Sequence, residues 1–188
     1  MLDLIGSDYW LFSKINQQWT NSFFDSLFLV IREGEFWTPF YLFLLVFAAI
    51  NFSKKGWWWM LAFILTVSLS DIVSSHIIKE IIFRPRPCND PYTRFIASYC
   101  PISSSFTSSH ACNHFAMATF IFFTLGHTGK WWRLVFLWAA SISYAQIYVG
   151  VHYPSDVVCG AIVGALLGFY MARLFARRIG VLKIENKY

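Results

Sequence analysis

Apolar residues in this chain gather in five long segments, and most polar residues lie between them. The segments cover residues 36–52, 57–78, 111–126, 131–150 and 157–175. An α-helix needs about 17–25 mostly apolar residues to cross a lipid bilayer. The pattern therefore predicts an all-α fold: a polytopic membrane helix bundle with about five transmembrane helices.

Residues 1–35 precede these spans and have a weaker pattern. The apolar segment 23–31 is too short to cross a bilayer and contains Asp25. Together with residues 8–19 it is typical of amphipathic helices that lie in the membrane interface. We therefore expect an interfacial N-terminal segment. No internal repeat or low-complexity linker divides the chain, so residues 1–188 are predicted to form a single domain.

The composition supports a membrane protein and excludes other classes. Of the 188 residues, 57% are apolar and 13% are charged, whereas about 25% are charged in soluble domains. One residue in five is aromatic, and a soluble domain of this size could not bury so much apolar surface. Soluble enzymes, disordered chains and nucleic-acid-binding modules are excluded, so no nucleic-acid partner is expected.

The basic residues predict how the bundle is oriented. Four of them lie in the loops at 54–55 and 130–133, and five more lie near the C-terminus. With five spans, these nine of the fifteen basic residues fall on one side, which the positive-inside rule makes cytoplasmic. The tail 176–188 is then cytoplasmic, and the loop 79–110 and the turn 151–156 lie on the extracytoplasmic (periplasmic) side of the cell membrane.

Three polar clusters fall on this outer side, each at the end of a span. Lys79 and Arg86 follow the second span, residues 107–110 open the third, and residues 152–156 open the fifth. Sites between the helices of a bundle are built from clusters that converge in this way. The loop 79–110 is therefore predicted to be an active-site loop.

The first two clusters suit a phosphate group. Lys79 offers a point charge and Arg86 a planar fork of donors, both suited to phosphate oxygens. Ser108, Ser109 and His110 present backbone N–H groups at a helix N-terminus, where anions bind readily. A phosphate ester or diphosphate is the substrate that these groups predict.

The third cluster supplies a nucleophile. Asp156 lies four residues after His152, so its carboxylate can fix the imidazole tautomer and leave the other nitrogen free to attack. His110 is then the acid that protonates the leaving oxygen. The site predicts phosphoryl transfer through a phosphohistidine. No His/Cys cluster has zinc-like spacing, so we expect neither a metal nor another cofactor.

These residues resemble the motifs of the type 2 phosphatidic acid phosphatase family, relatives of vanadium haloperoxidases and bacterial acid phosphatases. The first motif, Lys, six residues, Arg-Pro, is matched at residues 79–87. The second, Pro-Ser-Gly-His, is Thr-Ser-Ser-His at residues 107–110. The third, Ser-Arg, five residues, His, three residues, Asp, keeps His152 and Asp156 but has Ala145-Gln146 in place of Ser-Arg.

The resemblance implies the role of each site residue. His152 is the nucleophile, Asp156 orients it, and His110 is the general acid. The residues implied to bind the substrate phosphate are Lys79, Arg86, Ser108, Ser109 and, at the position of the family's arginine, Gln146.

Gln146 is the main departure from the family. A glutamine amide can donate a hydrogen bond but carries no charge and offers no planar fork. We expect weaker phosphate binding than in relatives that have the arginine. Arg84 or Arg94, from the same outer loop, is a candidate to take its place.

Cysteines and glycines add two structural expectations. Cys88 and Cys100 both lie in the outer loop, on the side where disulfides persist, so a disulfide that closes a loop of about a dozen residues is expected. Gly160, Gly164 and Gly168 have the small-xxx-small spacing that favours close helix packing.

Three functions remain open from the sequence. The first is an integral membrane hydrolase, a lipid phosphatase of phospholipid metabolism; the family suggests undecaprenyl diphosphate, phosphatidic acid, phosphatidylglycerol phosphate or lipid A phosphate as substrate. The second is a lipid phosphotransferase that uses the same intermediate. The third is a membrane transporter with His and Asp as a proton relay, although the polar groups gather at one face. The partners expected are the lipid substrate and the bilayer.

Overall fold

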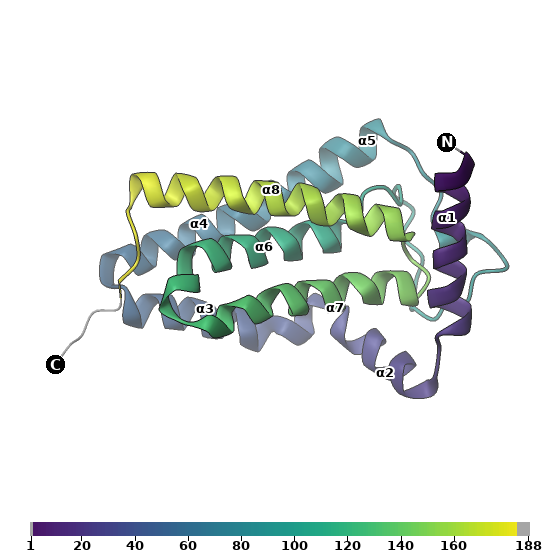
Figure 1. Ribbon diagram of the computed structural model, residues 1–188, viewed down its shortest axis with the longest axis horizontal. Coiled ribbons are helices and arrows are strands. Elements are labelled where there is room, and N and C mark those ends of the chain that lie inside the picture. Colours follow the sequence, from purple (N-terminus) through teal and green to yellow (C-terminus); the bar gives the residue numbers. More distant parts are fainter. Residues whose placement is uncertain (1, 184–188) are drawn as a thin grey trace.

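The computed structural model describes residues 2–183, and within this range every regular element is helical (Figure 1). The α-helices are α1 (Leu2–Ser13), α2 (Ser22–Ile31), α3 (Thr38–Asn51), α4 (Ser53–Asp71), α5 (Lys79–Ile81), α6 (Ser109–Leu125), α7 (Leu134–Tyr148) and α8 (Pro154–Arg178). Two π-helical segments, Lys14–Gln18 and Ile72–Ile78, follow α1 and α4. Short 3-10 helices occupy Gly34–Trp37, Pro87–Asn89, Gly126–Thr128 and Lys130–Arg133.

The five predicted spans correspond to α3, α4 with its continuation through α5, α6, α7 and α8. Three of the helical stretches are long and apolar enough to cross a membrane: Gly34–Asn51, Ser53–Ile81 and Pro154–Arg178. The other two, α6 and α7, have 17 and 15 residues. The all-α membrane bundle that the apolar pattern predicts is confirmed.

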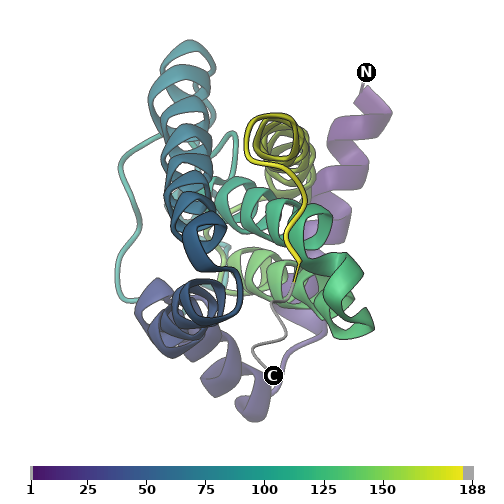
Figure 2. The ribbon, with the colours of Figure 1, turned by 90° about the vertical axis from the view of Figure 1, so that its left-hand side faces the viewer.

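Helix α6 lies at the centre, between α4, α7 and α8, as the end-on view shows (Figure 2). Its contact with α8 depends on the glycine series. A Cβ added at Gly164 would lie 2.0 Å from the carbonyl oxygen of Cys112, and one at Gly168 would lie 2.3 Å from that of Ala116. The predicted close packing is therefore within the chain, and it brings the N-termini of α6 and α8 side by side.

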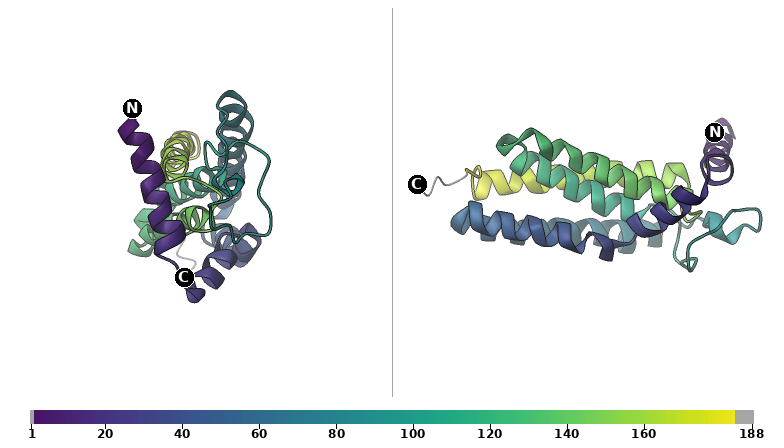
Figure 3. Two further views of the ribbon diagram at one scale, coloured as in Figure 1. Left: turned by 90° about the vertical axis from the view of Figure 1, so that its right-hand side faces the viewer. Right: turned by 90° about the horizontal axis from the view of Figure 1, so that it is seen from below.

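The two ends of the bundle differ in character. Helix α1 crosses one end, and the C-terminal segment lies at the other (Figure 3). At the C-terminal end the Lys55 ammonium donates to the carbonyl of Val181 (3.3 Å), and the His127 ring contacts the carbonyl of Leu182 (2.5 Å). The basic loops and α8's C-terminus thus share this end. Residues 184–188 of the predicted tail lie outside the described residues.

The N-terminal segment is attached to the α1 end by buried polar contacts. The Asn16 side chain donates to the carbonyls of Arg94 and Tyr148 (2.8 and 2.9 Å). The Tyr148 hydroxyl donates to Asp25 of α2 (2.6 Å). Phe28 and neighbouring apolar residues of α2 pack on α7. Both N-terminal helices therefore have fixed positions beside the outer loop.

Candidate active site

The three polar clusters lie together at the end of the bundle that α1 crosses. Lys79 begins α5, His110 is in the first turn of α6, and His152 lies between α7 and α8. Lys79 and His152 both lie within electrostatic reach of His110, and Lys79 also lies within electrostatic reach of Arg86 and Asp156. Sequence-distant motifs thus form one cluster because α6 and α8 pack so closely.

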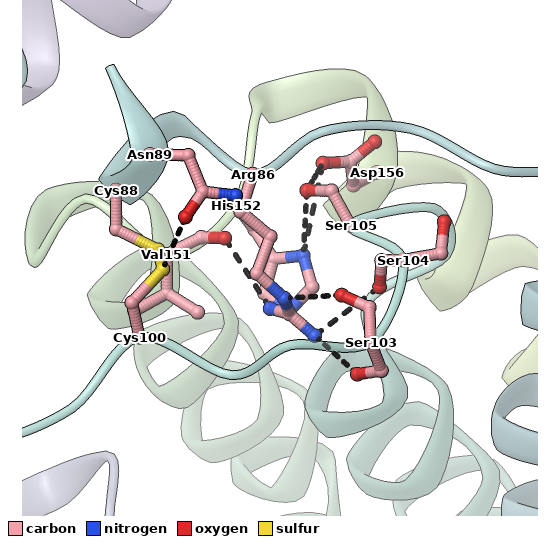
Figure 4. Close-up of a disulfide and its surroundings, with 10 residues drawn as sticks. All are labelled: Arg86, Cys88, Asn89, Cys100, Ser103, Ser104, Ser105, Val151, His152 and Asp156. Carbon is pink, nitrogen blue, oxygen red and sulfur yellow. Dashed lines mark hydrogen bonds and ion pairs between the residues drawn. A yellow bond between two sulfur atoms is a disulfide. The ribbon is translucent and has the colours of Figure 1, made fainter.

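His152 is buried against Arg86, as the close-up shows (Figure 4). Nε2 of the imidazole lies 3.1 Å from Nη1 of Arg86. A guanidinium only donates hydrogen bonds, so Nε2 must carry the lone pair. The remaining Arg86 donors bond the Ser103 carbonyl (2.8 Å), the Ser103 hydroxyl (3.1 Å) and the Ser104 carbonyl (3.2 Å). The lone pair of Nε2 therefore faces the Arg86 guanidinium.

The other imidazole nitrogen faces Asp156 and Ser105. Nδ1 of His152 lies 3.7 Å from Oδ2 of Asp156 and 3.4 Å from the Ser105 hydroxyl oxygen. Ser105 donates to Asp156 over 2.5 Å. Its oxygen is therefore free to accept the Nδ1–H, and Ser105 links the two residues. The sequence analysis missed Ser105; the serine run at 103–105 was its only trace.

Asp156 is fully buried and has several donors around it. Its Oδ1 accepts from Nη1 of Arg84 (2.6 Å), and its Oδ2 accepts from the backbone N–H of Tyr153 (2.9 Å) as part of the cap of α8. Arg84 also donates to Asp8 of α1 (2.6 Å). Asp8 in turn accepts from the N–H and hydroxyl of Ser155. Helix α1 thereby covers the side of the site where Arg84 and Ser155 lie.

Burial controls the protonation of the site. It lowers the pKa of His152 to about 4, although the hydrogen bond and charge of Asp156 oppose it. Burial also lowers the pKa of Arg86 to about 10. Burial alone would also lower the pKa of Arg84. The hydrogen bonds and charges of Asp8 and Asp156 outweigh burial there and raise the pKa of Arg84 above its ordinary value. At neutral pH His152 is uncharged and both arginines are cations.

The N-terminus of α6 offers part of the predicted anion site. Ser108 is the N-cap: its hydroxyl accepts from Ala111 N–H (3.4 Å), and its own N–H donates to the carbonyl of Asp156 (3.0 Å). The backbone N–H groups of Ser109 and His110 have no acceptor in the described part of the chain. Two free amides at a helix start suit a phosphate oxygen.

A polar network lies below this helix start. The Ser109 hydroxyl contacts that of Ser75 (2.8 Å), and Ser75 donates to Asp71 (3.0 Å). Asn113 also donates to Asp71 (3.1 Å). The Asp71 charge acts on Lys79, whose ammonium has no hydrogen bond or ion pair recorded among residues 2–183. Ser109 thus links the start of α6 to the π-helical segment Ile72–Ile78 that continues α4, and the Lys79 ammonium is left available to bind a ligand.

Gln146 and the two candidate arginines are placed differently from expectation. The Gln146 side chain is fully buried, and neither amide atom has a hydrogen-bond partner in the described residues. Arg84 is occupied by Asp8 and Asp156, and Arg94 pairs with Asp25 over 2.5 Å. Neither arginine is placed as a substitute for the missing one, because carboxylates of the protein already hold them.

A disulfide closes the outer loop. Cys88 and Cys100 are bonded, with their Cα atoms 5.9 Å apart (Figure 4). The bridge lies between Arg86 and the serines at 103–105, so it restrains both sides of the His152 environment. Among the residues that the structure describes, no group of three or more His, Cys, Asp or Glu side chains is arranged to hold a metal ion.

Comparison with known proteins finds one family. The sequence model of the PAP2 superfamily matches residues 55–179. The lipid A 4'-phosphatase of Bacteroides thetaiotaomicron is 31% identical over 157 residues, which are 78% of this chain and 68% of that protein. The undecaprenyl-diphosphatase of Sulfolobus acidocaldarius is 27% identical over 173 residues, 90% of this chain and 79% of that protein.

The solved structures agree with this result. The crystal structure of Aquifex aeolicus LpxE is 26% identical, has a TM-score of 0.66, and covers 87% of this chain and 93% of its own. A transmembrane PAP2-type phosphatidylglycerolphosphate phosphatase from Bacillus subtilis, at 21% identity and a TM-score of 0.63, shares the fold. The family resemblance that the three motifs indicate is confirmed.

Proposed function

We propose, since this chain belongs to the PAP2 superfamily, that it hydrolyses a lipid phosphate or diphosphate through a phosphohistidine at the extracytoplasmic membrane face. The chain is a multi-pass membrane protein, and its relatives include lipid phosphatases. The observation that carries the proposal is the buried imidazole of His152, whose Nε2 faces the Arg86 guanidinium at 3.1 Å. It combines an uncharged nucleophile with a phosphate-binding cation.

In the first step, Nε2 of His152 attacks phosphorus and the bond to the lipid oxygen breaks. Arg86, Lys79 and the free N–H groups at the start of α6 hold the phosphoryl oxygens, where they stabilise the developing charge. His110 gives its proton to the leaving lipid oxygen. Ser105 and Asp156 stabilise the proton on Nδ1 as the imidazole becomes positive.

In the second step, water attacks the phosphorus of the phosphohistidine. His110 now takes a proton from the water, the phosphorus–nitrogen bond breaks, and inorganic phosphate leaves. All the charges that this route uses come from side chains and backbone groups of the chain itself, so we propose a metal-independent reaction. If an alcohol took the place of water, the same intermediate would give phosphotransfer.

The proposed face follows from the charges and the disulfide. The Cys88–Cys100 bridge lies at the site end, and disulfides persist in oxidising compartments. The basic loops lie at the opposite end, as the positive-inside rule requires of a cytoplasmic surface. The three polar clusters lie at one end only, which argues against a proton path across the membrane.

Phosphate release from the purified protein in detergent tests the proposal. The panel contains undecaprenyl diphosphate, phosphatidic acid, phosphatidylglycerol phosphate and lipid A. We expect release from at least one lipid, and no release or acid-labile phosphoprotein from His152→Ala. The His110→Ala variant should still bind phosphate, but the lipid leaving group should depart slowly because no acid protonates its oxygen. Substantial turnover by His152→Ala would overturn the mechanism, and transfer to an alcohol without phosphate release would establish the phosphotransferase.

A further inference from the structure

The side chain at the place of the missing arginine is polar and buried, and it lacks hydrogen bonds to the described residues. Gln146 has no exposed surface, and both its amide atoms lack a partner in the described chain. A buried amide without hydrogen bonds is costly, and native proteins rarely leave one. The unpartnered amide therefore points to a ligand oxygen that binds beside it.

A second buried side chain, that of Arg32, lacks a hydrogen bond at its Nε in the part of the chain that the structure describes. Arg32 follows the last residue of α2 and is only 7% exposed, and its Nε has no hydrogen-bond acceptor within residues 2–183. The same Nε forms a long ion pair with Oε1 of Glu33 at 3.5 Å, and the side chain of Glu33 is 59% exposed. Arginine is almost never buried unless it is paired. A mostly exposed carboxylate at this distance compensates such a charge poorly.

Arg32 lies within electrostatic reach of the catalytic groups. Its charge acts on His110 and contributes to the lowered pKa of Arg86. Lys79 is a third cation in the same cluster, and the carboxylate of Asp156 is already shared with Arg84. Like charges gathered in a buried place repel one another unless an anion binds among them. The cluster as a whole thus favours a phosphate ligand.

The position of Arg32 is fixed by its surroundings. The Trp37 indole donates to the carbonyl of Ile31 (2.7 Å), the residue before Arg32. At the other end of α2, Asp25 binds both the hydroxyl of Tyr148 and the guanidinium of Arg94. Helix α2 also packs on α7, the helix that carries Gln146. These contacts fix helix α2, and with it the backbone position of Arg32.

We propose that Arg32 binds the substrate phosphate and supplies the positive charge that Gln146 lacks. Gln146 then contributes a neutral amide donor to the same anion. The inference rests on the proposed phosphatase function and adds a binding residue to it. Arg32 lies in the N-terminal segment, outside residues 55–179 that match the family, so the proposed cation comes from the turn after α2 and not from α7.

The test measures two effects of inorganic phosphate: its inhibition constant as a product of the reaction, and the rise in melting temperature that it causes when it binds. We expect Arg32→Gln to raise the inhibition constant for phosphate at least tenfold and to lower kcat/KM by about 100-fold, the usual effect of removing one transition-state donor. Arg32→Lys should lie between the wild type and Arg32→Gln, because it keeps the charge and loses the fork. Adding Gln146→Arg to Arg32→Gln should restore phosphate binding, since it returns the cation to α7.

Arg133→Gln is the matched control, because it removes an exposed arginine at the opposite end of the bundle. It should leave phosphate inhibition unchanged. A folded Arg32→Gln protein with wild-type phosphate inhibition would overturn the inference while hydrolysis by the wild type still supported the proposed function. If the wild type released no phosphate from any lipid of the panel, the proposed phosphatase function would be wrong. The loss of thermal stabilisation by phosphate in Arg32→Gln would then still decide whether Arg32 binds the anion.

Discussion

The Ser105 hydroxyl links the carboxylate of Asp156 to the imidazole of His152 by hydrogen bonds. Asp156 lies 3.7 Å from Nδ1 of His152, too far for a good hydrogen bond. The Ser105 hydroxyl spans the gap, because it donates to the carboxylate and is positioned to accept from Nδ1. It therefore fixes the tautomer in which Nδ1 carries the proton and Nε2 carries the lone pair that faces Arg86.

We expect Ser105→Ala to lower kcat about tenfold, the effect of losing one buried hydrogen bond worth about 1.4 kcal/mol, and to change KM little. Steady-state kinetics on the preferred lipid measures both. Ser98→Ala, an exposed serine of the same loop, is the control. Equal activity of Ser105→Ala and the wild type would mean that Asp156 reaches His152 without help.

The second prediction at this scale concerns the pH dependence of His152. Its pKa is about 4 in the native protein and about 6.5 in an unfolded chain. As the pH falls from 6.5 to 4, the unfolded chain takes up a proton that the native chain does not, so this residue lowers stability across that window. Above pH 6.5 it has no such effect.

NMR of labelled histidines checks this shift. The His152 resonance, identified by its loss in His152→Ala, should not titrate between pH 7 and 5, whereas in denaturing detergent it should titrate near 6.5. A native midpoint near 6.5 would show that the imidazole is not desolvated.

Sequence patterns predicted some site residues and not others. His152 and Asp156 were predictable because their spacing places both at one helix start. The contacts of Asp8, Arg84 and Ser105 were not, because their partners lie 51 or more residues away and meet only after the helices pack. Arg84 was expected instead to replace the missing arginine.

Among the elements, the contact between α6 and α8 determines the geometry of the site. It places the α6 start, with His110, beside the α8 start, with Asp156, and the Ser108 N–H to Asp156 carbonyl bond joins the two. Gly164 permits this approach, since its Cα lies against the α6 backbone. The glycine spacing predicted close packing, but it did not reveal which helix is the partner.

We expect Gly164→Ala to push α8 away from α6, because the new Cβ would lie 2.0 Å from the Cys112 carbonyl oxygen. The cost of such overpacking is about 1–3 kcal/mol, so the melting temperature and kcat should both fall. Gly6→Ala adds the same methyl group to α1 where nothing lies within 4 Å, and it should change neither. An unaltered melting temperature in Gly164→Ala would show that the backbones can separate freely.

The apolar pattern predicted the spans well and their ends less well. Helical structure continues past the second predicted span to Ile81, and α7 ends at Tyr148, before the predicted end of its span. A polar residue such as Lys79 can remain helical where a charge on a neighbouring helix, here that of Asp156 on α8, stabilises it. Hydropathy alone does not include that tertiary contribution, so the number and order of the spans were predictable and their polar ends were not.

For the whole molecule, the distribution of charge separates a basic end from the site end. The loops at 54–55 and 130–133 and the last turn of α8 lie at the basic end, while α1 and the disulfide loop lie at the other (Figure 1). Helix α8 begins beside the site and ends at Arg178, so its two ends lie at opposite ends of the bundle (Figure 1). The orientation of the whole protein can therefore be tested with one labelled residue at each end.

Thiol labelling of intact cells provides that test. The background carries Cys112→Ser and Cys159→Ser, which remove the free thiols and keep the disulfide. In this background, Gln18→Cys places an exposed thiol at the site end, and Lys54→Cys places one at the basic end. A maleimide that cannot cross membranes should label Gln18→Cys in intact cells and Lys54→Cys only after the cells are permeabilised. The positive-inside rule is the physical reason, because basic loops resist transfer across the membrane. The reverse labelling pattern would place the site on the cytoplasmic side and would contradict the proposed access to lipids of the outer leaflet.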